Sequence, residues 1–171
     1  MNYQEFIRDV HNFPKEGILF RDITPLLNEG HVYRSAIDCL AEKARLWHAD
    51  VIVGPEARGY VVGAPLAYAL RLGFVPVRKK GKLPAETVSV SYELEYGTDI
   101  LQMHADAIKS GQRVVVADDL LATGGTMRAT VVLVEKLGGL VVGAAFLIEL
   151  TPLLGRSRLP GIDIETLVSY K

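Results

Sequence analysis

Residues 113–126 have the sequence Arg-Val-Val-Val-Ala-Asp-Asp-Leu-Leu-Ala-Thr-Gly-Gly-Thr, and the organisation of the whole chain is clearest from there. The apolar run at residues 114–117 is unbroken and rich in β-branched side chains, which is typical of a central strand buried on both faces. Two adjacent carboxylates, Asp118 and Asp119, stand at the expected end of that strand. Their place predicts a ligand site at the carboxyl edge of a parallel sheet.

A loop of small residues follows the two acids and leads into residues 127–137, whose apolar spacing predicts a helix. Its glycines permit close approach of a ligand, and its threonines add hydroxyl donors. Free amides and partial positive charge at the start of a helix make such a loop a phosphate cradle. A phosphate beside two acids suits a sugar phosphate, whose hydroxyls the acids would bind directly or through a magnesium ion. The loop consists of Ala122, Thr123, Gly124, Gly125 and Thr126.

Length and composition indicate one ordinary globular domain. The 171 residues are 49% hydrophobic and 23% charged, which is enough for a sizeable core. A net charge of -1 gives no general attraction to nucleic acid or to an anionic membrane. The single cysteine, Cys39, excludes an internal disulfide, and no Gly-x-Gly or Gly-Lys-Ser/Thr sequence indicates a dinucleotide or Walker site. No signal-like or membrane-length apolar run occurs, so we expect a cytoplasmic protein.

The N-terminal segment gives two local predictions. Apolar residues between Tyr3 and Val10 recur at helical spacing, which predicts a short helix. Residues 13–24 lack that period and are interrupted by Pro14 and Gly17, which predicts a loop.

Strands and helices alternate along the rest of the chain, which predicts a mostly parallel sheet with helices on both faces. Helices are expected at residues 33–46, 61–70 and 127–137, and strands at residues 51–53, 74–77, 114–117, 140–148 and 167–168. Alternating residues on either side of a polar tip predict a hairpin. We therefore expect a single doubly wound α/β domain over residues 1–171, with an N-terminal hood (about residues 1–30) and a flexible hairpin flap (about residues 86–104).

Four of the nineteen basic residues lie within residues 78–82. A solvated loop is the ordinary interpretation of such a run. Its place at the carboxyl end of an expected strand favours a role in the ligand site instead.

Residues 113–126 closely resemble the phosphoribosyl pyrophosphate signature of the type I phosphoribosyltransferases. Three further segments, at residues 13–23, 78–84 and 94–97, resemble the members of that family that use adenine. The resemblance covers nearly the whole chain. It implies that adenine and phosphoribosyl pyrophosphate react to give AMP and pyrophosphate, with Mg2+ as cofactor, in a homodimeric enzyme of purine salvage.

The resemblance also assigns residues to the phosphoribosyl group. Residues 122–126 would hold the 5′-phosphate, and Asp118 and Asp119 would hold the ribose hydroxyls. Magnesium would have no direct protein ligand and would be held through the substrate, near these two acids.

A second loop, after residues 51–53, would bind pyrophosphate. Arg58 resembles the family's pyrophosphate-loop arginine, whose guanidinium suits a bidentate phosphate contact. Many relatives have a non-proline cis peptide here, which would fall between Glu56 and Ala57. Basic side chains would neutralise the pyrophosphate, Lys79 first among them, and Arg78 would reach the neighbouring subunit's site. The expected pyrophosphate-binding set is Glu56, Ala57, Arg58, Lys79, Lys80 and Lys82.

The base would lie under the hood. Phe20 would stack on the adenine ring, while the main chain of Leu19 and Arg21 would read its Watson–Crick edge. Such main-chain pairs distinguish amino from oxo groups, because the wrong purine leaves a buried polar group unpaired. Leu120 would line the same pocket.

The expected catalytic residues are Glu95, Tyr96 and Arg58. Glu95, at the flap tip, would either exchange a proton with the imidazole ring of the purine or only position the base. Tyr96 would exclude water when the flap is closed.

Two alternatives remain at this stage. One is a phosphoribosyltransferase for another purine, xanthine or guanine, which would differ in the hood and flap. The other is a regulator that senses phosphoribosyl pyrophosphate without chemistry, although the chain shows neither an added domain nor a basic excess.

Overall fold

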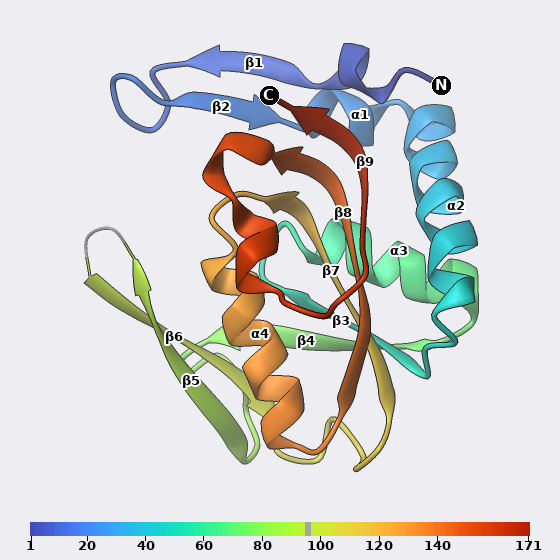
Figure 1. Ribbon diagram of the computed structural model, residues 1–171, viewed down its shortest axis with the longest axis vertical. Helices are drawn as coiled ribbons and strands as arrows, with labels where there is room; N and C mark the ends of the chain where they lie inside the picture. Colours follow the sequence, from blue (N-terminus) through green and yellow to red (C-terminus); the bar gives the residue numbers. More distant parts are fainter. Residues whose placement is uncertain (95–96) are drawn as a thin grey trace.

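A seven-stranded sheet forms the centre of the structure, a computed structural model that describes residues 1–94 and 97–171 (Figure 1). Its strands lie in the order β5-β6-β4-β3-β7-β8-β9. Strands β4, β3, β7, β8 and β9 are parallel, and the β5–β6 hairpin extends one edge in antiparallel fashion. The strands are Val51–Pro55 (β3), Gly73–Lys79 (β4), Thr87–Leu94 (β5), Gly97–His104 (β6), Arg113–Leu121 (β7), Leu140–Leu150 (β8) and Ile164–Tyr170 (β9).

Helices cover both faces of this sheet, which confirms the predicted doubly wound α/β fold (Figure 1). Successive side chains of a strand point to opposite faces. In β7, Val115 and Ala117 therefore pack with α2 and α3, whereas Val114 and Val116 pack with α4, and all four are 0% exposed. The helices are Thr24–Asn28 (α1), Gly30–Leu46 (α2), Tyr60–Leu70 (α3) and Gly125–Lys136 (α4). None of the helices in residues 1–94 and 97–171 combines the length and apolar character that a bilayer-spanning segment needs.

The N-terminal hood corrects both local predictions. A 3-10 turn, Tyr3–Phe6 (η1), is followed by two antiparallel strands, Arg8–His11 (β1) and Leu19–Asp22 (β2), in place of a helix and a loop. Tyr3 and Ile7 do face the core, but Val10 pairs with Phe20 across the ribbon. The ribbon lies across the end of the sheet where β8 and β9 terminate (Figure 1). It buries no complete face, so its sequence carries no alternating pattern.

The central strand is longer than predicted. β7 continues to Leu121, so Asp118 and Asp119 lie inside the strand rather than at its end, and α4 begins two residues early, at Gly125. The cause is the neighbouring strand β8, which extends far enough to pair Glu149 with Leu121.

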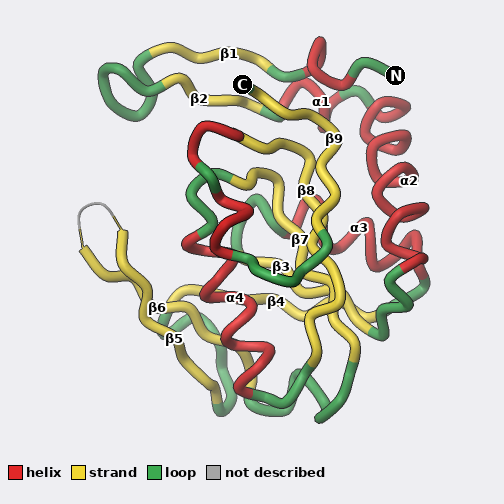
Figure 2. The backbone as a smooth tube through the Cα atoms, viewed as in Figure 1, coloured by secondary structure: helices red, strands yellow, loops and turns green. Residues whose placement is uncertain are grey.

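The predicted flap is a β-hairpin that leans along α4 (Figure 2). The Nζ atom of Lys136 donates a hydrogen bond to the carbonyl of Ser89 at 2.8 Å. A Cβ added at Gly125 would lie 3.8 Å from Cδ2 of Tyr92, so β5 passes close to the start of α4. Glu95 and Tyr96, the expected catalytic residues of the flap tip, lie outside the described residues.

Candidate active site

A cleft of about 240 Å³ opens at the carboxyl ends of β3 and β7. The loops that follow these two strands form its walls, because β3 and β7 are parallel neighbours in the sheet. Its lining takes in residues 56–58 and residues 118–127. The structure thus brings together the acids, the small-residue loop and Arg58, as the sequence predicted.

The conformation of the small-residue loop requires glycine at position 124. Gly124 has a φ of 80°, a left-handed conformation that favours glycine. A Cβ added there would lie 2.6 Å from the carbonyl oxygen of Gly155, so the site also lacks room for a side chain. The first residues of α4 line the cleft, and the first amides of a helix have no helical acceptor. The loop and the helix start therefore present donors and partial positive charge to an anion.

The acid pair lies deep in this cleft. Asp119 is 2% exposed. Its backbone amide donates a hydrogen bond to Oδ1 of Asp118 at 2.9 Å. The Nε atom of Arg58 lies 3.2 Å from Oδ2 of Asp119, which makes an ion pair, although that oxygen receives no well-aligned hydrogen bond. Burial, together with the charge of Asp119, raises the pKa of Asp118 well above its ordinary value. Burial also raises the pKa of Asp119, against the opposing effect of Arg58.

The second loop contains the cis peptide that the resemblance implied, between Glu56 and Ala57. Oε1 of Glu56 accepts the amide hydrogen of Lys79 at 2.7 Å, and its Oε2 accepts a hydrogen bond from Nζ of Lys82 at 3.0 Å. Burial alone would raise the pKa of Glu56, but these bonds and the charges of Lys82 and Arg78 outweigh it and lower the pKa. Glu56 is therefore a carboxylate that contacts Arg78, Lys79 and Lys82 of the basic run.

The basic side chains lie beside the cleft. Nζ of Lys79 is 3.0 Å from Oδ2 of Asp99 on β6, and Arg78 donates to the carbonyl of Lys82 at 3.0 Å. The backbone amide of Lys80 donates a hydrogen bond to the carbonyl of Ile100 on β6 at 3.1 Å. Within the described residues, the lining of the cleft includes none of these basic side chains. Their expected contact with pyrophosphate thus stays a prediction.

An apolar pocket of about 520 Å³ lies between the hood and α3. Phe20 lines it, and the ring of Phe13 meets that of Phe20 edge-on at 5.1 Å between centroids. Ala57 and Arg58 line both this pocket and the cleft, so the two spaces are adjacent. The guanidinium carbon of Arg58 stands 5.2 Å from the centroid of the Phe20 ring.

The other base-binding candidates have different surroundings. Leu19 is 37% exposed, and the guanidinium of Arg21 pairs with Asp9 and lies 3.6 Å from the centroid of the Tyr170 ring. The carbonyl of Ile18 accepts the amide of Phe13, and main-chain groups alternate in direction along a strand. This alternation indicates that the main chain of Leu19 and Arg21 faces away from β1. Leu120 lines the cleft rather than the apolar pocket.

Sequence reasoning missed two supporting residues. Gly155 packs its backbone against the small-residue loop, and Asp99 pairs with Lys79. Both contacts join residues that are far apart in the sequence, and neither residue belongs to a local pattern, so no signal in the chain pointed to them.

The acids fit a shared magnesium site rather than a protein-only one. Among the described residues, no three or more His, Cys, Asp or Glu side chains are grouped to hold a metal. In the part of the chain that the structure describes, Oδ2 of Asp119 is buried without a hydrogen bond and has only the ion pair with Arg58, so it can still accept a contact from a cation or a hydroxyl. Magnesium commonly uses one or two carboxylates together with substrate phosphates and water, which is the donor set available here.

Comparisons with known proteins agree with this geometry. The family model described as "Phosphoribosyl transferase domain" matches residues 23–157. The adenine phosphoribosyltransferase of Desulfitobacterium hafniense (strain Y51) is 56% identical over 170 residues, which cover 99% of this chain and 98% of that protein. The crystal structure of adenine phosphoribosyltransferase from Thermoanaerobacter pseudethanolicus superposes with a TM-score of 0.96 at 55% identity, over 98% of each chain. The Saccharomyces cerevisiae enzyme, complexed with adenine and an imino-altritol bisphosphate, superposes with a TM-score of 0.89 at 41% identity, over 96% of this chain and 97% of that one.

Proposed function

The chain belongs to the adenine phosphoribosyltransferases, and from that premise we propose how its residues divide the reaction among them. The enzyme transfers the 5-phosphoribosyl group of phosphoribosyl pyrophosphate to adenine and gives AMP and pyrophosphate, a reaction of purine salvage. Identity of 56% along the whole chain sets aside a binding-only regulator and an enzyme for xanthine or guanine.

One observation supports the division most directly: an anion-binding cleft and an apolar pocket adjoin at Ala57 and Arg58. A sugar phosphate needs the first environment and a flat purine the second. The anomeric carbon, whose bond to pyrophosphate breaks as its bond to adenine forms, would then lie where the two spaces join, next to Arg58.

The phosphoribosyl group would occupy the cleft. Residues 122–126 and the start of α4 would bind the 5′-phosphate, and Asp118 and Asp119 would accept hydrogen bonds from the ribose hydroxyls. Bound magnesium would supply neutralising charge to the hydroxyls and the pyrophosphate, with Asp118 and Asp119 as the protein residues that hold it through the substrate.

Pyrophosphate would lie along the second loop. Breaking its bond to the anomeric carbon leaves an oxocarbenium-like centre and a highly charged leaving group, so positioned cations are the main requirement. Arg58 would bind it with its guanidinium fork. Lys79, Lys80 and Lys82 would neutralise the remaining charge of the pyrophosphate. To reach it, Lys79 would leave its ion pair with Asp99, and Lys82 would leave its ion pair with Glu56.

The base would lie between the hood and the cleft. Phe20 would stack on the purine, Leu120 would bound it from the cleft, and the outward main chain of Leu19 and Arg21 would read the amino group. The position of Arg21 is supported by its contacts with Asp9 and Tyr170, which tie β2 to β1 and to the last strand of the sheet.

A homodimer is also part of the proposal. Arg78 would reach the neighbouring subunit's site, and in this chain its guanidinium lies 3.5 Å from Oε2 of Glu56. Sedimentation at micromolar concentration tests the dimer, and a monomeric active enzyme would remove Arg78 from the neighbour's site.

The direct test is a panel of bases with phosphoribosyl pyrophosphate and magnesium. Adenine should be turned over with a kcat/KM at least about 10²-fold above those of guanine, hypoxanthine and xanthine, because main-chain pairing rejects an oxo group. Preferred turnover of guanine would contradict the base assignment. Tight binding of phosphoribosyl pyrophosphate without pyrophosphate release for any base would favour a regulator.

Gly124→Ala is expected to raise KM for phosphoribosyl pyrophosphate by about tenfold or more, since a left-handed alanine is strained and its Cβ has no room. The added atom would meet the carbonyl of Gly155 at 2.6 Å and displace the loop. Gly161→Ala is the matched control, because Gly161 has a φ of 75° but nothing within 4 Å of an added Cβ. Equal KM changes in the two variants would show that backbone strain, not the loop position, causes the effect.

A further inference from the structure

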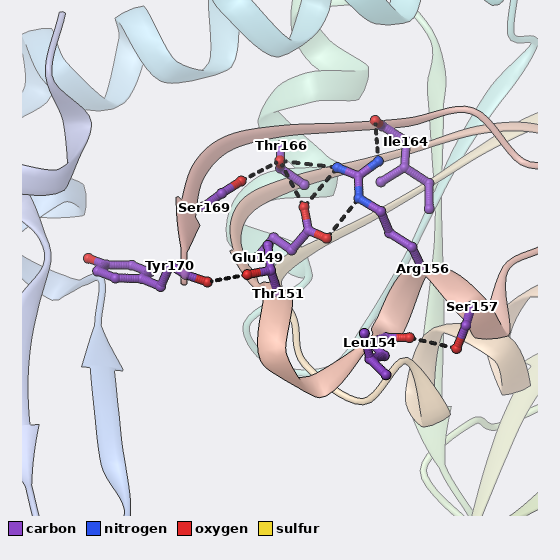
Figure 3. Close-up of polar contacts among 9 residues, drawn as sticks. All are labelled: Glu149, Thr151, Leu154, Arg156, Ser157, Ile164, Thr166, Ser169 and Tyr170. Atoms are coloured by element: carbon purple, nitrogen blue, oxygen red, sulfur yellow. Dashed lines mark hydrogen bonds and ion pairs between the residues drawn. The ribbon is translucent and has the colours of Figure 1, made fainter.

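An ion pair between a buried carboxylate and a half-exposed guanidinium lies behind the phosphate loop, residues 122–126, and outside the lining of the cleft. Glu149, near the carboxyl end of β8, is 5% exposed. Arg156 belongs to the 3-10 turn Gly155–Arg158 (η3) and donates from Nε and Nη2 to the two carboxylate oxygens of Glu149, at 2.7 and 2.8 Å (Figure 3). Such a contact through two parallel hydrogen bonds fixes the orientation of the guanidinium relative to the carboxylate and adds to the attraction between their charges.

The pair belongs to a network that joins three elements. Arg156 also donates to the carbonyl of Ile164 at 3.2 Å, and the hydroxyl of Thr166 donates to Glu149 at 3.3 Å (Figure 3). Hydrogen bonding from Arg156 lowers the pKa of Glu149 against the effect of burial, so the carboxylate is charged at neutral pH. Together these bonds hold η3 against β8 and β9.

The same turn forms the rear wall of the phosphate loop. A Cβ added at Gly155 would lie 2.4 Å from the carbonyl oxygen of Ala122, and one added at Gly124 would lie 2.6 Å from the carbonyl oxygen of Gly155. The two backbones therefore touch with no side chain between them. Glu149 is also the register partner of Leu121, the residue just before the loop. Any shift of η3 would be passed directly to residues 122–124.

We propose that Glu149 and Arg156 are positioning residues for the phosphate loop. They hold η3 against residues 122–124 and so preform the cradle that takes the 5′-phosphate of phosphoribosyl pyrophosphate. The inference rests on the proposed function of that loop. Neither residue lines the cleft, so their effect on the reaction passes through the loop backbone.

A purely structural role makes a different prediction. Loss of stability alone would reduce the amount of active enzyme, which lowers the apparent kcat and leaves both KM values unchanged. Displacement of the loop would instead raise KM for the substrate that carries the 5′-phosphate and spare adenine, whose pocket lies under the hood.

The test uses Glu149→Gln in the full chain. We expect KM for phosphoribosyl pyrophosphate to rise by about tenfold, with KM for adenine within about twofold of the wild type. Arg156→Lys should give a smaller rise, because lysine keeps the charge but loses the fork. The matched control is Glu135→Gln, which breaks the exposed pair of Glu135 with Arg128 at 3.6 Å and should leave both KM values unchanged.

If Glu149→Gln fails to fold, Thr166→Val removes one hydrogen bond of the network and should raise KM for phosphoribosyl pyrophosphate by about two- to threefold. An unchanged KM for phosphoribosyl pyrophosphate in the folded variants, or equal changes in both KM values, overturns the positioning role. Wild-type enzyme that fails to convert adenine would instead refute the proposed function, so the two failures are distinguishable.

Discussion

Replacing Asp118 and Asp119 together by asparagine is expected to lower kcat/KM for phosphoribosyl pyrophosphate by about 10³-fold, the scale seen when one positioned polar group is lost from an active site. Asparagine keeps the shape of aspartate but removes the charge that would attract the ribose hydroxyls and magnesium. Within the described residues, Oδ2 of Asp119 receives no hydrogen bond and has only the ion pair with Arg58 at 3.2 Å, so a ligand hydroxyl or cation would compensate its burial further.

The same double variant should be more stable than the wild type. The pKa values of both acids are raised in the folded chain, so their favourable contribution is present below the ordinary carboxyl pKa and is lost as the pH rises through the raised values. Above the raised pKa values the buried charges therefore destabilise the free enzyme, and asparagine avoids that cost. A gain of about 1 kcal/mol would raise Tm by about 2–4 °C. The gain should shrink as the pH falls through the raised pKa values, because the wild-type acids take up protons there.

Thermal melts at pH 5 and pH 8, alongside steady-state kinetics, check both parts. Asp38→Asn is the control, because Asp38 is exposed on α2 and pairs only with Arg34 at 3.6 Å among the ion pairs of the described residues. A double variant with normal kcat/KM would remove the acids from ribose binding. A variant that melts lower than wild type at pH 8 would contradict the proposed electrostatic cost.

How far the sequence predicted the molecule depended on burial. Residues 114–117 are buried on both faces, so their apolar run indicated the strand directly, and the cleft followed because parallel strands end at one edge. The prediction for the hood was wrong because its ribbon covers the end of the sheet and leaves residues such as Leu19 exposed. A strand that pairs with a single other strand and buries no complete face shows no alternating apolar pattern by which its sequence could be recognised.

Contacts between distant residues were the second limit. The glycines of the phosphate loop predicted an anion site, but its rear wall, Gly155, comes from a turn after the next strand. The basic run was recognised, whereas its partners Glu56 and Asp99 were visible only after β3, β4 and β6 had been placed side by side. A resemblance transfers the residues that touch a ligand more readily than the residues that hold them in place.

Glu95→Gln is expected to lower kcat by about 10²- to 10³-fold while KM for phosphoribosyl pyrophosphate stays within about threefold, because proton transfer by a positioned side chain contributes on that scale. Glu95 lies three residues after Tyr92, whose ring carbon Cδ2 would be 3.8 Å from a Cβ added at Gly125, the first residue of α4. The described part of the hairpin thus passes near the site, and the role of Glu95 stays a prediction because that residue lies outside the described residues.

Glu86→Gln, at the other end of the hairpin, is the matched control for the flap substitution. Glu86 is exposed, and its carbonyl accepts the amide of Ala105 at 2.9 Å, so the substitution leaves that hydrogen bond intact. A proton-transfer role further requires that the wild-type rate depend on the ionisation of Glu95, so the acidic limb of the kcat profile should disappear in Glu95→Gln. If the variant lowers kcat but keeps that limb, Glu95 only positions the base, and the proton must pass through another group.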